Sequence, residues 1–82
     1  MAKILYFAAL VDALGTSSEE VTLPPSVTDV RGLLAWLRRR GENWDRALME
    51  NTVQVTVNRQ FAAPETKIEN TVEIAIVSAR RG

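Results

Sequence analysis

Residues 3–9 read KILYFAA, and the predicted fold is built outward from this stretch. The run combines branched and aromatic side chains, and both of its alternating faces are apolar. A strand with one solvated face alternates apolar and polar residues, whereas a strand in mid-sheet is apolar on both faces. The run is therefore predicted to form a central strand.

Two further strands are predicted on either side of the middle of the chain. Glu19 to Leu23 alternates polar and apolar residues and is followed by Pro24-Pro25, which is typical of a half-buried strand that stops there. Residues 72–77, VEIAIV, are strongly apolar and predict a closing strand.

A tight hairpin is predicted between these strands. Residues 53–57, VQVTV, alternate as a strand, and Asn58-Arg59 can turn the chain into a short returning strand over 60–62. Lys67-Ile68 is expected to form a short bridge, followed by a turn over 69–71.

The clearest helix lies between the two halves of the sheet. Its apolar positions follow the spacing i, i+3, i+4, i+7 of one helix face, namely Val30, Leu33, Leu34 and Leu37. Thr28 is the expected N-cap, with Asp29 in the first turn, and Gly41 is expected to end the helix. Gly32 inside the helix suggests either close packing or a tolerated defect.

Two shorter helical segments are also predicted. Residues 10–14 form a brief turn of helix stopped by Gly15, and Asn43 is expected to cap a short helix carrying Trp44, Ala47 and Leu48 on one side. The basic residues 38–40 are interpreted as a solvated helix end that complements the helix dipole.

This order of elements predicts one α+β domain with the β-grasp arrangement. A mixed sheet of about four to five strands would pair its first and last strands in parallel, with one main helix across one face and a shorter second helix. The domain is expected to span residues 1–77, and residues 78–82 would form a flexible tail.

Composition narrows the function. The chain of 82 residues has neither cysteine nor histidine, so a metal site, a bound cofactor and a self-contained active site are not expected. Ten basic residues balance ten acidic ones, so neither nucleic acid nor a membrane surface is an expected partner. The chain is expected to be soluble and cytoplasmic.

The last five residues, Ser78-Ala79-Arg80-Arg81-Gly82, allow two interpretations. Chain ends often simply fray. Alternatively, a carboxylate on glycine, which has no side chain, can enter another protein's narrow active site and be activated there.

Several short motifs, in order, resemble the small subunit of molybdopterin synthase, a ubiquitin-like sulfur carrier family. They are Lys3 to Ala8 followed by Leu14-Gly15, Thr28 opening the helix, Val57-Asn58, Ile68, Val72-Glu73-Ile74 and the terminal glycine. The resemblance implies a substrate-like subunit, in which a ubiquitin-activating-type enzyme uses ATP to adenylate Gly82 before sulfur transfer makes a thiocarboxylate. It also implies that the large subunit of molybdopterin synthase receives the tail.

The resemblance places partner-binding residues at Phe7, Phe61 and Ile76 on the sheet, where each could equally belong to the core. For Arg80 and Arg81 in the tail, a docking role and an ordinary solvated basic end are equally open. Family members typically end in two glycines, whereas this chain ends in one after an arginine. A thiamine-type sulfur carrier and a non-catalytic ubiquitin-like interaction module or protein modifier therefore stay open as alternatives.

Overall fold

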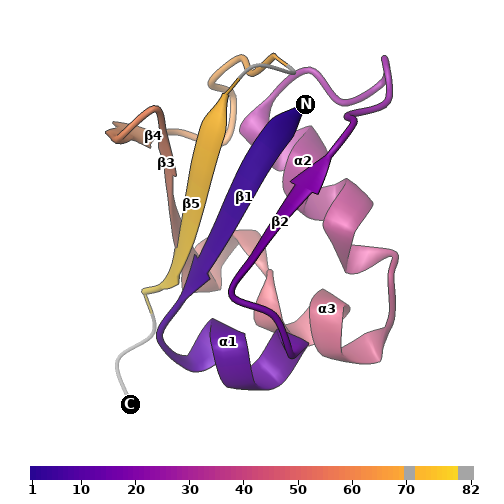
Figure 1. Cartoon of the computed structure of the whole chain (residues 1–82), viewed down its shortest axis with the longest axis vertical. Coiled ribbons are helices and arrows are strands. Elements are labelled where there is room, and N and C mark those ends of the chain that lie inside the picture. Colours follow the sequence, from indigo (N-terminus) through magenta and orange to yellow (C-terminus); the bar gives the residue numbers. More distant parts are fainter. Residues whose placement is uncertain (70–71, 80–82) are drawn as a thin grey trace.

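The structure is a computed structural model that describes residues 1–69 and 72–79, drawn in Figure 1. Its strands are β1 (Ala2–Phe7), β2 (Ser18–Val21), β3 (Val53–Val57), β4 (Gln60–Ala62) and β5 (Glu73–Ser78). Its helices are α1 (Ala9–Leu14), α2 (Val30–Arg38) and α3 (Glu42–Ala47), with a short 3₁₀ turn over Glu50–Thr52.

The five strands form one mixed sheet in the order β2-β1-β5-β3-β4. β1 and β5, the first and last strands, run parallel side by side, and the other neighbours are antiparallel. In Figure 1, α2 runs behind β1 and β2, while α1 and α3 lie near the end of the sheet where β1 and β5 finish. The predicted β-grasp fold is confirmed.

The core lies between the sheet and the helices. Ile4 and Tyr6 of β1, with Ile74 and Ile76 of β5, are at most 1% exposed. The predicted apolar face of α2 packs against them with Val30, Leu33, Leu34 and Leu37, all buried. Removing this apolar surface from water is the main force that holds the helix on the sheet.

The helix caps differ from the sequence predictions. Asp29, and not Thr28, is the N-cap of α2, and its Oδ1 accepts a hydrogen bond of 2.8 Å from the Gly32 N–H. A Cβ on Gly32 would lie 3.1 Å from that oxygen, so the glycine leaves room for the cap. The second helix also begins earlier than predicted, with Gly41 and not Asn43 at its N-cap, and α2 ends at Arg38.

The turns predicted at Gly15 and at Asn58-Arg59 are confirmed. Gly15 ends α1 with a φ of 75°, and Asn58 and Arg59 have φ values of 51° and 71°, which is the geometry that joins β3 to β4 in a two-residue hairpin. Lys67 forms an isolated bridge with Asp29. β5 ends at Ser78, one residue later than predicted, and the predicted turn over 69–71 lies partly outside the described residues.

Candidate functional site

One face of the sheet is not packed into the core. Side chains alternate along a strand, so the residues between the buried ones point away from the helices. On this face lie five apolar residues, which together are called the open sheet face: Leu5, Phe7, Phe61, Ala75 and Val77. Phe61 is 80% exposed and Phe7 is 44% exposed, so the two aromatic rings are its most accessible parts.

The strand register makes these residues neighbours. Leu5 of β1 is opposite Ala75 of β5, Ala75 is opposite Thr56 of β3, and Thr56 is opposite Phe61 of β4. In the same pairing of β1 with β5, Phe7 is opposite Val77. The open sheet face therefore extends over β1, β5 and β4, with the polar Thr56 of β3 between Ala75 and Phe61. An accessible apolar surface of this kind is typical of a protein interaction site.

Ile76 does not belong to this surface, although it was predicted to bind a partner. The side chain is fully buried on the helix side of the sheet, between the outward-pointing Ala75 and Val77. The prediction is wrong because the run around Ile76 is apolar on both faces, so alternation could not tell which residues point inward.

Charged residues lie at one end of the open sheet face. Lys3 on β1 has Glu20 opposite it on β2 and Glu73 opposite it on β5. Glu73 also faces Arg59 across 3.8 Å, with Arg59 90% exposed. Exposed pairs of this kind contribute little to stability, but they give the apolar surface a polar boundary.

The other end of the open sheet face lies at the root of the tail. Because β1 and β5 are parallel, the last residues of β5 leave the sheet beside Phe7. Ala79, the last described residue, donates its N–H to the carbonyl oxygen of Thr52 over 3.0 Å. The predicted site residues Gly82, Arg80 and Arg81 lie outside the described residues.

Ala8 follows Phe7 and has an unusual backbone. Its φ of 57° and ψ of −136° are angles that glycine adopts readily and that other residues avoid. This conformation turns the chain sharply from β1 into α1, and the Ala8 carbonyl accepts a hydrogen bond from the Val11 N–H. A strained residue therefore adjoins the root of the tail.

A polar cluster joins the sheet to α2 and α3 on the opposite side. The buried Tyr6 hydroxyl donates a 2.7 Å hydrogen bond to Glu19, which also accepts one of 2.7 Å from Arg40. The Arg40 guanidinium lies 4.7 Å from the ring centre of Trp44 and 5.6 Å from that of Trp36. These contacts bring the ends of β1, β2, α2 and α3 together.

The cluster shifts the pKa values of its ionisable groups, including those of Tyr6 and Glu19. Burial, followed by the bond to Glu19, raises the pKa of the Tyr6 phenol above its ordinary range. Burial also raises the pKa of Glu19, but the hydrogen bonds from Arg40 and Tyr6 outweigh it, so the pKa of this carboxyl is lowered overall. Glu19 is therefore held as a carboxylate, and its Oε2 is shared between Tyr6 and Arg40.

Within residues 1–69 and 72–79, no acidic cluster is arranged to hold a metal ion. In the same part of the chain, no helix has the length and apolar character needed to span a membrane. The candidate site is the open sheet face together with the end of β5, which lies beside Phe7.

The fold defines a class of protein, the β-grasp or ubiquitin-like domains. A sequence profile described as the ThiS family matches residues 4–82. The chain belongs to the ThiS family. The predicted resemblance to a ubiquitin-like sulfur carrier is thereby confirmed. A search of curated proteins found no match.

Solved structures show the same fold. A Pyrococcus furiosus protein assigned as molybdopterin converting factor subunit 1 has 22% identity and a TM-score of 0.77, over 94% of each chain. Small archaeal modifier protein 1 of Haloferax volcanii has 19% identity and a TM-score of 0.74, also over 94% of each. A chain of the Amycolatopsis orientalis BexX/CysO complex has 16% identity and a TM-score of 0.69, over 100% of this chain and 99% of that one.

Sequence reasoning missed the smaller members of the open sheet face, Leu5, Ala75 and Val77. Part of the signal was present, because with Phe7 facing outward the alternation along β1 places Leu5 on the same face. The β5 residues depend on the register with β1, which the sequence pattern does not give.

Proposed function

We propose that this protein is a sulfur carrier for molybdopterin synthesis, activated at the carboxylate of Gly82. The observation that carries the proposal is the parallel pairing of β1 with β5, which places Phe7 and Val77 together at the root of the tail. A partner that covers the open sheet face would thereby lie next to the chain end that it must process.

The proposed chemistry begins with an adenylating enzyme of the ubiquitin-activating type. A carboxylate oxygen of Gly82 attacks the α-phosphorus of ATP, and pyrophosphate leaves with the electrons of the broken P–O bond. Sulfide then attacks the carboxyl carbon of the acyl adenylate, the bond to AMP breaks, and a thiocarboxylate remains. Activation as an anhydride makes the carbon electrophilic, and the absence of a side chain on glycine leaves it accessible.

This division of labour suits the composition of the chain. With no histidine and no cysteine, the sequence lacks the usual general base and thiol nucleophile, so both would come from the partner. The large subunit of molybdopterin synthase is the proposed acceptor of the sulfur. The open sheet face, with Phe7 and Phe61, is the proposed docking surface for both partners.

Two candidates within the same class differ in where the activated carboxylate goes. The structural similarity to a small archaeal modifier protein, together with the arginines before Gly82, favours a protein modifier as the second candidate. A modifier would transfer Gly82 to a lysine amine, whereas a carrier would end as a free thiocarboxylate. The family assignment also includes the thiamine-type carrier, which would make the same thiocarboxylate.

The first test is conversion in vitro. The full chain is incubated with the adenylating enzyme of its source organism, ATP and sulfide, and then weighed by mass spectrometry. We expect a mass increase equal to replacing one oxygen by one sulfur. A chain lacking Gly82 should fold equally well and show no conversion, because the described core ends before this residue. An unchanged wild-type mass, in an assay that converts a control carrier, would contradict the proposal.

A further inference from the structure

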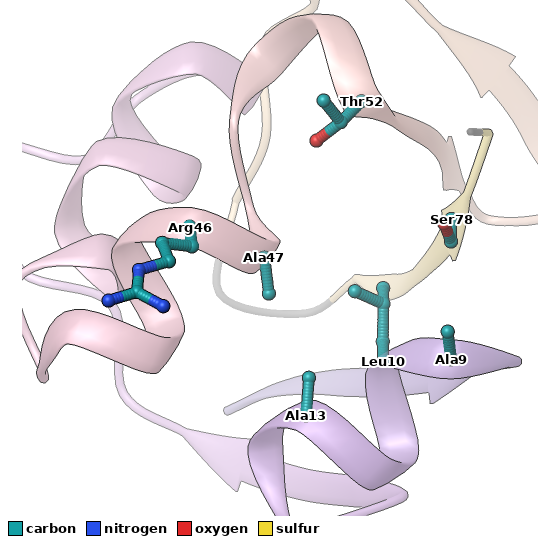
Figure 2. A pocket seen from close by; sticks show the side chains of 7 residues that line it. All are labelled: Ala9, Leu10, Ala13, Arg46, Ala47, Thr52 and Ser78. Atoms are coloured by element: carbon teal, nitrogen blue, oxygen red, sulfur yellow. The ribbon is translucent and has the colours of Figure 1, made fainter. Parts of the chain in front are cut away.

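A hollow of about 170 Å³ lies between α1 and α3. Figure 2 shows the side chains of Leu10, Ala13 and Ala47 directed toward the same space, with Ala9 beside them. Leu10 is 3% exposed and joins the hollow to the core, while the three alanines leave the volume unfilled. An apolar cavity of roughly 150 Å³ is enough to hold a benzene ring, so this hollow is large enough for one leucine or aromatic side chain.

Two polar side chains at the hollow, those of Arg46 and Thr52, already have partners. Arg46 at the rim forms a 2.7 Å ion pair with Glu42, and both side chains are more than 70% exposed. The hydroxyl of Thr52 donates to the Met49 carbonyl over 2.8 Å. No strong charge is thus left to bind a charged ligand, and the hollow best suits an uncharged, apolar occupant.

The hollow also lies at the root of the tail. Ser78, the last residue of β5, is part of its wall, as is Thr52, whose carbonyl holds the Ala79 N–H. Three residues separate Ala79 from the Gly82 carboxylate, and three extended residues reach at most about 11 Å. A protein that closes its active site on this carboxylate must therefore bring its surface close to the hollow.

We propose that the hollow between α1 and α3 is a second docking point, which receives one large apolar side chain of the adenylating enzyme. The inference rests on the proposed function, because it takes Gly82 as the group to be activated. Adenylation is the step shared by the molybdopterin, thiamine and modifier pathways, so the adenylating enzyme is the partner common to all three. The open sheet face and the hollow would then hold the domain on both sides of the tail.

The test fills the hollow without changing its charge. Ala13→Leu and Ala47→Leu each add an apolar side chain that occupies the space, and leucine keeps nearly the helix propensity of alanine. Ala35→Leu is the matched control, because Ala35 is an exposed alanine on α2 and is not part of the hollow. Affinity for the source organism's adenylating enzyme is measured by calorimetry, and the rate of ATP-dependent adenylation is measured on the same samples.

We expect both filling variants to bind at least about tenfold more weakly than the wild type, and Ala35→Leu to stay within about twofold. Circular dichroism identifies any variant that is not folded; Ala13 is exposed, so its variant keeps the test decisive if Ala47→Leu unfolds.

If folded Ala13→Leu binds the adenylating enzyme as tightly as the wild type, and the wild type is adenylated, the docking role of the hollow is overturned and the proposed function is not. Slower adenylation at unchanged affinity would show that the tail itself uses the hollow. A wild type that is dimeric in solution, with filling variants that are monomeric, would show that a second copy occupies it. Either result would overturn the inference. A wild type that is never adenylated would overturn the proposed function as well.

Discussion

At the scale of single residues, the most informative position is Ala8. Its backbone lies where glycine is normally found, directly between Phe7 of the open sheet face and the first residue of α1. The strain is not compensated by any buried contact of the side chain, because Ala8 is exposed. The tight junction between β1 and α1 imposes it.

Ala8→Gly is expected to stabilise the protein by roughly 0.5–1 kcal/mol. An unfavourable positive φ costs alanine about 1–2 kcal/mol, and the greater freedom of glycine in the unfolded chain offsets part of that gain. Urea unfolding measures the change. Ala35→Gly, in the exposed part of α2, should instead destabilise the protein by about 1 kcal/mol. Equal destabilisation by both substitutions would contradict the strain at Ala8.

Single residues are also where sequence reasoning fails most clearly. Thr28 and Asp29 are both good capping residues. Asp29 is the N-cap because the helix begins at Val30, where the Asp29 side chain can accept the hydrogen bond from Gly32. Ile76 lies in a run where both faces of the strand are apolar, so its burial depends on the pairing with β1 and β3.

At the scale of elements, the network around Glu19 connects the sheet to the helices. The carboxylate accepts hydrogen bonds from Tyr6 of β1 and from Arg40, which follows α2 and lies over Trp44 of α3. Hydrogen bonds to charged groups with limited solvent contact are among the stronger ones in proteins. The network should therefore contribute measurably to the docking of α2 and α3 on the sheet.

Glu19→Gln is expected to cost about 1–3 kcal/mol at neutral pH. Because the folded pKa of Glu19 is lowered, its stabilisation is present above the ordinary pKa of 4.5 and is lost as the pH falls through the lower folded value. The difference between wild type and variant should therefore shrink in acid, as urea unfolding at several pH values would show. Glu20→Gln, at the exposed neighbouring position, is the control. A difference that does not change with pH would contradict the network.

β4 offers the sharpest test of the open sheet face. Phe61→Ser should weaken binding to the adenylating enzyme by about tenfold or more, because exposed aromatic residues often dominate interfaces. Stability should change little, since Phe61 is 80% exposed. Gln60→Ser, at an exposed position of the same strand, is the control, and calorimetry measures both. Unchanged affinity for Phe61→Ser would exclude this face from the interface.

The strands and helices were well predicted from the sequence, whereas their first and last residues were not. The apolar patterns of β1, β3, β5 and α2 are long enough to identify each as a strand or a helix. Asn58-Arg59 has the residue types of a tight turn. Caps and ends moved by a residue or two because they depend on hydrogen bonds such as that between Asp29 and Gly32.

At the scale of the whole molecule, the order of elements was enough to predict the β-grasp fold. A hairpin, a crossover helix and a final apolar strand have few compact arrangements, and the parallel pairing of β1 with β5 is one of them. The hollow between α1 and α3 could not be predicted in this way. It exists only because two short helices far apart in the sequence meet at the end of the sheet.

The central claim is that Gly82 is the reactive end of a carrier. The most direct measurement is the intact mass of the protein isolated from its own cells, together with the mass of its carboxyl-terminal peptide. We expect a fraction in which a thiocarboxylate replaces the carboxylate of Gly82. A peptide that always ends in an unmodified carboxylate, in cells that contain the adenylating enzyme, or that continues beyond Gly82, would contradict it.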